Sequence, residues 1–106
     1  MSEKVQTILA ELRRRFQALY GPRLVKMILY GSQARGDAEP GSDIDVLVVL
    51  EGPVDACEEI HRTSDDVWQL SYEHEETICC VFMDEHHFST RNGPLLRNIR
   101  REGVAL

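Results

Sequence analysis

Two strongly apolar segments, residues 24–30 and 43–50, are separated by a polar stretch that contains three glycines and a proline. Short apolar runs bounded by glycine and proline predict two buried strands joined by a turn. The second run begins with Asp43 and Asp45, and residues two apart in a strand point to the same face. Because ionised carboxylates are costly to bury, this pair indicates a strand end that opens on a cleft.

The turn between the two strands carries groups suited to phosphate. Gly31 has no side chain to hold a ligand away, and Ser32 brings a hydroxyl. If a short helix starts at about Gln33, its free N–H groups point into the same pocket and favour an anion there. The two aspartates, with Cα atoms roughly 6.5 Å apart, can converge on one divalent ion. A phosphate-binding turn beside paired carboxylates favours metal-assisted nucleotide chemistry.

The motif Gly-Ser-x-x-Arg-Gly from residue 31, followed by Ser-Asp-Ile-Asp from residue 42, resembles the nucleotidyltransferase superfamily of the DNA polymerase β type. Within it, the chain is most similar to the minimal nucleotidyltransferase domains of bacteria and archaea. The resemblance is strongest over residues 25–50, and the length and order of elements extend it to the whole chain. It implies a small mixed β-sheet covered by helices, with the first two strands antiparallel.

The resemblance also implies roles for individual residues. The residues expected to bind the nucleotide, ATP or another nucleoside triphosphate, are Gly31, Ser32, Arg35 and Ser42. Asp43 and Asp45 are expected to hold Mg²⁺ and to be catalytic. Without the resemblance, the two aspartates are also compatible with an exposed strand entry, and Arg35 with a surface arginine paired to Asp37 or Glu39.

Active members of the superfamily usually carry a third carboxylate on the strand that follows the next helix. In this chain the corresponding segment, residues 77–83, contains no Asp or Glu. Glu76 lies just before it and Asp84 just after it. A shift of one residue along a strand sends a side chain to the other face. Three alternatives therefore stay open: Glu76, Asp84 or no residue completes the metal site.

Helical periodicity supplies the remaining elements. Apolar residues at helical spacing predict a helix over residues 3–19, ended by Gly21-Pro22, and a second over 54–72 with Pro53 in its first turn. Asp84 can cap a short helix, and residues 95–101 form a last helix with Gly103 as its stop. The order of elements predicts an α/β (α+β) fold. A length of 106 residues predicts a single domain over residues 1–106.

Composition narrows the possible classes of function. The formal net charge of −6 argues against a nucleic-acid-binding surface over most of the protein. No apolar run is long enough to span a membrane, and the polar N-terminus does not resemble a signal peptide. A cytoplasmic location is therefore expected.

The three cysteines allow two interpretations. We expect buried, reduced thiols, because three cysteines cannot all pair with one another and two of them are adjacent. The alternative is a zinc site, although no metal-type spacing such as Cys-x-x-Cys occurs. Its ligands would be drawn from Cys57, Cys79, Cys80, His86 and His87.

Minimal nucleotidyltransferases similar to this chain are commonly paired with a small helical HEPN-type protein. There they act as antitoxins, in some cases by moving AMP from ATP to a tyrosine of the toxin. The resemblance implies this Mg²⁺-dependent transfer to a partner's hydroxyl. Two alternatives are a catalytically weak or degenerate domain that neutralises its partner by binding, and transfer to a small molecule. Because little chain is left to build an acceptor site, a partner protein or a homo-oligomer is expected to complete the cleft.

Overall fold

The computed structural model describes residues 1–106. Its helices are α1 (Glu3–Tyr20), α2 (Ser32–Arg35), α3 (Ala56–His74), α4 (Glu85–Thr90) and α5 (Pro94–Glu102), with a 3₁₀ turn η1 (Gly21–Arg23). Its strands are β1 (Leu24–Tyr30), β2 (Ile44–Leu50), β3 (Ile78–Asp84) and β4 (Val104–Ala105). They form one sheet in the order β3-β2-β1-β4. β1 is antiparallel to β2 and β4, and β2 is parallel to β3, which confirms the predicted mixed sheet.

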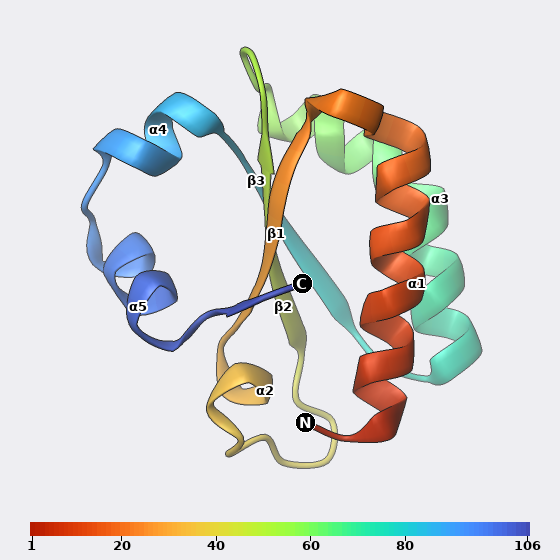
Figure 1. Ribbon diagram of the computed structural model, residues 1–106. Helices are drawn as coiled ribbons and strands as arrows, with labels where there is room; N and C mark the ends of the chain where they lie inside the picture. Colours follow the sequence, from red (N-terminus) through yellow and green to blue (C-terminus); the bar gives the residue numbers. More distant parts are fainter.

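Helices cover both faces of this sheet. Figure 1 shows α1 and α3 on one side and α4 and α5 on the other, with α2 at one end. The larger apolar cluster lies under α1 and α3, and a smaller one lies between the sheet and α5. Alternate residues of β2 divide between them: Val46 and Val48 pack in the larger cluster, and Leu47 and Val49 in the smaller.

β2 is the central apolar strand, and its residues from Val46 to Leu50 have no exposed surface. Continuous burial on both faces explains its uninterrupted apolar sequence. The same prediction for β1 is wrong in its first half, where Val25 and Lys26 are exposed. The register between β1 and β2 shifts between Leu24 and Lys26, and such an irregularity disturbs the alternation of side chains.

The helix boundaries follow from capping. Ser2 caps α1 by accepting a hydrogen bond from the amide of Val5, and Gly21 follows its last residue as predicted. α3 begins later than predicted. Its N-cap is Asp55, so Pro53 lies before the helix and not in its first turn. The Asp55 carboxylate accepts a hydrogen bond from the amide of Glu58 at 3.2 Å. A side-chain oxygen that satisfies a free amide defines the helix start more strongly than a proline two residues earlier.

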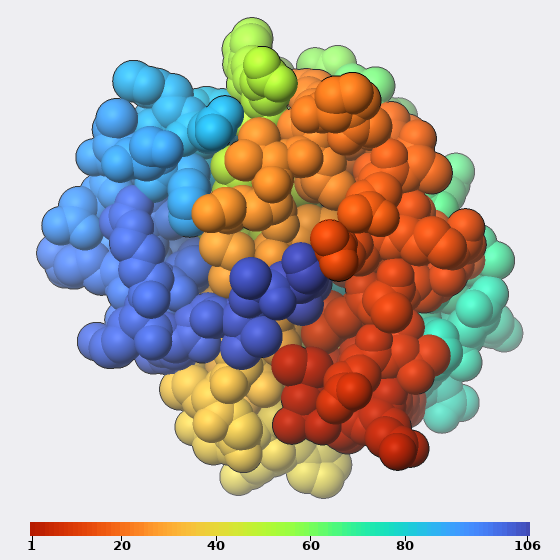
Figure 2. Space-filling view, viewed as in Figure 1, coloured from red at the N-terminus to blue at the C-terminus, as the bar shows by residue number.

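The short strand β4 was not predicted. α5 ends at Gly103, as expected, and the next two residues pair with Ile28 and Leu29 of β1. A Cβ at Gly103 would collide with the Ile99 carbonyl oxygen and the Ile28 side chain, so only glycine fits at this position. In Figure 2 the last residues, in dark blue, lie between α1 and α5. Two exposed residues carry too little pattern to be recognised as a strand.

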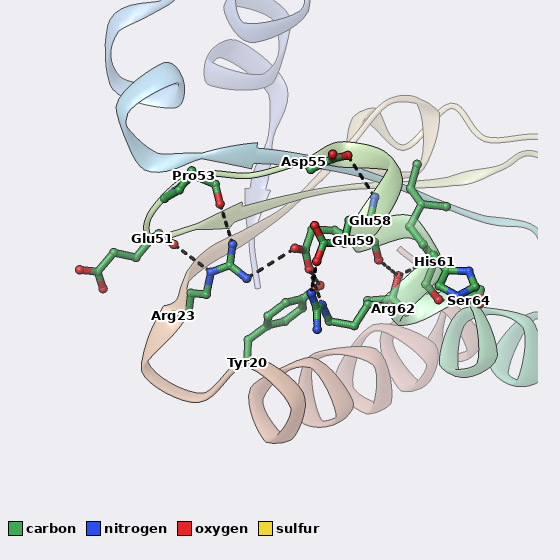
Figure 3. Close-up of polar contacts among 12 residues, drawn as sticks. Tyr20, Arg23, Glu51, Pro53, Asp55, Glu58, Glu59, His61, Arg62 and Ser64 are labelled. Carbon is green, nitrogen blue, oxygen red and sulfur yellow. Dashed lines mark hydrogen bonds and ion pairs between the residues drawn. The ribbon is translucent and has the colours of Figure 1, made fainter.

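One buried polar cluster ties α1 to α3. Glu59 of α3 is only 2% exposed, and its carboxylate accepts hydrogen bonds from Tyr20 at 2.7 Å and from Arg62 at 3.0 Å. Arg23 reaches the other carboxylate oxygen at 3.5 Å and also donates to the Glu51 and Pro53 carbonyls (Figure 3). Every member of this cluster has a partner, which is the condition under which buried charge is tolerated.

None of the helices is both long and apolar enough to cross a membrane.

Candidate functional site

The site is built where β1 ends and β2 begins. Tyr30, the last residue of β1, pairs with Asp45, so Gly31 follows directly beside that aspartate. Gly31 has φ 77° and ψ −159°, a conformation that is essentially restricted to glycine. A Cβ at this position would lie 2.5 Å from Oδ2 of Asp45. Glycine is therefore required here twice, for its backbone angles and for the space that the carboxylate occupies.

The turn continues as the short helix α2. The Gly31 carbonyl accepts from the amides of Ala34 and Arg35, and Gly36 closes the helix in the left-handed conformation. The first amides of a helix have no partner within it, and the N-cap residue Gly31 has no side chain that could satisfy them. The Ser32 hydroxyl and the adjoining amides can therefore donate to an external acceptor.

Asp43 and Asp45 converge with Cys79, which sequence reasoning had considered only for the alternative zinc site and not beside the aspartates. Asp43 immediately precedes β2 and is exposed, whereas Asp45 and Cys79 are half-buried. One ligand atom from each of the three lies within 4.8 Å of the other two. The Cys79 thiol donates a hydrogen bond to Oδ2 of Asp43 at 3.8 Å. The cluster is a candidate metal centre made of two carboxylates and a thiol.

The sheet explains why this cluster stays open. Asp45 lies on the same side of β2 as Leu47 and Val49, which pack against Leu96 and Ile99 of α5. That cover ends before it reaches Asp45. The aspartates therefore lie at the uncovered end of an otherwise buried face, as the cost of burying charge led us to expect.

Within the cluster, burial and the neighbouring carboxylates disfavour the ionised forms of Asp45 and Cys79. Burial raises the pKa of Asp45, the charge of Asp43 raises it further, and Arg35 offsets only part of this. Burial likewise raises the pKa of the Cys79 thiol, with Asp43 and Asp45 adding to the effect. A divalent cation would relieve both effects, so the donor set and its charge fit such an ion.

Arg35 and Ser42 lie near the cluster but have partners within the protein. Arg35 forms ion pairs with Asp37 at 3.2 Å and with Glu102 of α5 at 3.0 Å. The surface-pair interpretation is therefore correct for Asp37, while Glu39 is not involved. The Ser42 hydroxyl accepts from the amide of Glu39 at 2.9 Å and closes the loop that leads to Asp43. Nucleotide contacts by these two residues stay predictions.

Neither candidate for the third carboxylate belongs to the cluster. Asp84 pairs in register with Leu50, five residues along the sheet from the pair Asp45 and Cys79, a separation of roughly 16 Å. It caps α4 instead, accepting from the amide of His87 at 2.8 Å. Glu76 forms an ion pair with Lys4 at 3.2 Å. Of the three alternatives, the structure leaves the one in which no third carboxylate is present.

Cys79 could have been found only with the register of the sheet in hand. The parallel pairing of β2 and β3 places it opposite Asp45, and periodicity within a single strand cannot supply that alignment. The one signal in the sequence was the absence of an acidic residue from this strand, because another residue must then lie beside the aspartates.

The other predictions about cysteine need correction. All three thiols are free, but Cys57 is exposed and the other two are only half-buried. The ligand set of the zinc alternative is wrong: of its five residues only Cys79 belongs to a group of metal-ligating side chains, and it does so with Asp43 and Asp45. Cys79 and Cys80 are neighbours in β3 and point to opposite faces.

A groove adjoins the cluster between α3 and the edge strand β3. It has a volume of about 480 Å³ and is mainly apolar. Its lining includes Ile60, Trp68 and Phe82, and Cys79 belongs both to this groove and to the metal-ligand cluster. Trp68 is 66% exposed and stacks on Tyr72, which is 72% exposed. Exposed aromatic surface of this kind is typical of interaction sites.

Solved structures with the same fold include toxin–antitoxin complexes. One, crystallised with AMP-PNP, has a TM-score of 0.61 at 17% identity. The alignment covers 88% of this chain and 68% of the neighbour's chain. A complex from Shewanella oneidensis, described as tri-AMPylated HEPN toxin with MNT antitoxin, has a TM-score of 0.54 at 14% identity, covering 92% and 70%. A nucleotidyltransferase from Sulfolobus solfataricus has a TM-score of 0.60 at 20% identity, covering 99% and 86%.

A search of curated protein sequences found no match. The family model for the nucleotidyltransferase domain matches residues 9–105. That range contains the glycine turn, the aspartate pair and all four strands. On this evidence the chain belongs to the nucleotidyltransferase domain family.

Proposed function

We propose that this chain moves a nucleoside monophosphate, AMP from ATP, to a hydroxyl on a partner protein. The observation that carries the proposal is the contact between the turn and the carboxylates, in which Gly31 leaves only enough room for Oδ2 of Asp45. Phosphates bound along the turn would lie beside the aspartates. Members of this family typically use a nucleoside triphosphate and a divalent metal, and the cluster provides donors for both.

The residues divide the work as follows. Ser32 and the amides at the start of α2 bind the phosphates, and Asp43 and Asp45 hold the divalent ion. When bound, the ion would neutralise charge on the phosphates while the hydroxyl attacks and pyrophosphate leaves in line with it. Arg35 turns from Asp37 and Glu102 to the phosphates. Its side chain is 45% exposed, and exposed ion pairs contribute only about 0–1 kcal/mol, so a bidentate phosphate contact can replace them. Ser42 positions the loop that carries Asp43.

The proposed acceptor is a helical HEPN-type protein, for which this chain acts as antitoxin. This part of the proposal draws on the neighbours, one of which is described as a complex with AMP-PNP and another as a complex with an AMPylated toxin. The apolar groove lined by Trp68 and Ile60 supports it, because the groove reaches the cluster at Cys79. A partner helix lying there would present its hydroxyl to the nucleotide.

A second candidate function is neutralisation by binding alone. The observation that favours it is the absence of a third carboxylate, since Cys79 occupies the position opposite Asp45. In the superfamily pattern that acid acts on the attacking hydroxyl. A chain without it can keep the partner-binding surface and lose transfer.

The first experiment is a thermal shift with ATP, with Mg²⁺ and with both, repeated on the double variant Asp43→Asn/Asp45→Asn. Millimolar ATP on a micromolar site stabilises the folded state by about 4 kcal/mol. We expect a shift that needs both ligands and is lost in the variant. No shift with any combination would contradict the nucleotide site.

The second experiment separates the enzyme from the binding module. The chain is incubated with the purified partner and ATP labelled either at the α-phosphate or at the γ-phosphate. Transfer of AMP labels the partner only from the α-phosphate, and the label is absent with the double variant. A partner that binds tightly but takes up no label would establish the second candidate.

A further inference from the structure

Cys79 occupies a position that packing does not explain. Its neighbour Cys80 points to the opposite face and packs against the core under α1 and α3. Cys79 instead has its Sγ against the Asp43 carboxylate and belongs to neither apolar cluster. Two neighbouring carboxylates are unusual surroundings for the half-buried thiol of a cysteine with only a structural role.

We propose that Cys79 is the third protein ligand of the divalent ion held by Asp43 and Asp45, and that its sulfur shifts this site from Mg²⁺ toward Co²⁺, Zn²⁺ and Cd²⁺. The inference deepens the proposed function and rests on its metal site. Mg²⁺ takes hard oxygen ligands, whereas thiolate favours the softer ions. A single side chain thus sets the metal preference of the cluster.

The distances agree with a shared ion. In a tetrahedral site with metal–oxygen and metal–sulfur bonds of about 2.1 and 2.3 Å, the oxygen and sulfur lie roughly 3.6 Å apart. Sγ of Cys79 and Oδ2 of Asp43 are 3.8 Å apart. The third donor, from Asp45, lies within 4.8 Å of both. An ion can therefore contact all three with little movement of the side chains.

On binding, the metal ion replaces the thiol proton of Cys79. The thiol S–H bond breaks as the sulfur–metal bond forms, and the proton leaves to water. The dipositive ion then faces two carboxylates and one thiolate, and water or a phosphate oxygen completes its coordination. No oxidant or reductant is required.

The test uses Co²⁺ and Cd²⁺ as probes on the full chain without nucleotide. Bonding of sulfur to either ion gives a sulfur-to-metal charge-transfer band in the ultraviolet that oxygen ligands do not give. We expect the band in the wild type and in the double variant Cys57→Ser/Cys80→Ser, which keeps only Cys79. We expect it to be lost in Cys79→Ser and in Asp43→Asn/Asp45→Asn.

Metal preference gives an independent readout. Cys79→Ser should weaken Cd²⁺ binding by roughly 10- to 100-fold, at least the effect of losing an outer contact to a ligand, while the Mg²⁺-dependent ATP shift changes far less. Cys79→Asp, which places a carboxylate opposite Asp45, should strengthen the Mg²⁺-dependent shift. Both comparisons use the same thermal measurement on folded protein.

The outcomes distinguish the two proposals. A Mg²⁺-dependent ATP shift without any charge-transfer band would overturn the sulfur ligand and leave the nucleotidyltransferase assignment standing. A band that survives in Cys79→Ser but not in Cys80→Ser or Cys57→Ser would also overturn it, because another thiol would be the ligand. If both the ATP shift and the band are absent, both proposals fail.

Discussion

Two groups of acidic side chains in this protein differ in how their charge is balanced. Glu59 is buried, yet Tyr20, Arg62 and Arg23 surround its carboxylate with donors. Burial raises the pKa of Glu59, but these hydrogen bonds outweigh it and hold the pKa below its usual value. Asp45 is less buried, yet burial and the nearby Asp43 leave its pKa raised.

The difference separates a carboxylate that serves the fold from one to which the proposed function gives a ligand. The protein neutralises Glu59 by itself, and the result joins α1, α3 and the turn after β2. At Asp43 and Asp45 it leaves repulsion that only a cation from outside can relieve. An unbalanced acidic pair at the open end of a strand is the physical mark of a site.

The largest expected effect is on transfer. Asp45→Asn should reduce the rate of AMP transfer by about 100-fold or more, because the lost charge acts on the reacting phosphates. Glu59→Gln should leave the rate per folded molecule unchanged. Its carboxylate is fully paired and lies with Arg23 and Glu51, at the end of β1 and β2 opposite to Gly31 and Asp45. Rates are measured at saturating ATP on protein confirmed to be folded. Equal loss in both variants would remove the distinction between the two groups.

The glycine turn gives the next effect. Gly31→Ala adds a Cβ that meets Asp45 and also strains the backbone, whereas Gly52→Ala has a similar positive φ but open space around it. Backbone strain alone costs about 1–3 kcal/mol and is common to both variants. Only Gly31→Ala should also abolish the ATP-dependent thermal shift. If Gly52→Ala weakens nucleotide binding as much, the contact with Asp45 has no special role.

Stability should respond in the opposite order. Glu59→Gln leaves Tyr20 and Arg62 without their charged acceptor, and we expect a loss of roughly 2 kcal/mol in the free energy of unfolding. The matched control is Glu58→Gln, one residue away, whose exposed carboxylate pairs with the same Arg62 at 3.0 Å. Exposed pairs contribute about 0–1 kcal/mol. Urea unfolding of the two variants measures the difference, and equal losses would contradict the role given to burial.

The smallest effect concerns pH. Because the folded-state pKa of Asp45 is raised, its ionisation destabilises the fold, and this cost disappears as pH falls below the unfolded value near about 4. Asp45→Asn should therefore be more stable than the wild type by roughly 0.5 kcal/mol at neutral pH, with no advantage in acid.

Glu59 has the opposite sign, because its folded-state pKa is lowered. Its contribution is complete above the unfolded pKa and is lost as pH falls through the folded one. The deficit of Glu59→Gln should shrink in acid. Unfolding curves measured over the pH range in which carboxylates titrate give both trends. If the stability of the two variants changes with pH in the same direction, the two charges do not have opposite effects on stability.

Much of the fold was accessible from sequence because its signals are local. The helical period of α1, the apolar runs of β1 and β2, and the glycines at 31 and 36 each act within a few residues. The start of α3 was also accessible, since Asp55 followed three residues later by Glu58 is a capping pattern. Pro53 marks the helix start less strongly than this pattern does, because a proline satisfies none of the free amides.

What could not be predicted depends on residues far apart in the chain. The pairing of Asp45 with Cys79, the ion pair of Arg35 with Glu102 and the two-residue strand β4 all require the sheet to be assembled. The aspartate pair itself was readable, because both members lie within one segment. Its third neighbour was not, because strand register is set by packing over the whole sheet.

The central place of β2 has a consequence for how the protein opens. β2 is hydrogen-bonded to a strand on each side and covered on both faces, so its amides should exchange with solvent only when the whole molecule unfolds. The edge strands β3 and β4 can separate at lower free energy. Fluctuations that release Cys79 would thus leave Asp45 in place, so the Asp45 carboxylate is held in position for longer than the thiol beside it.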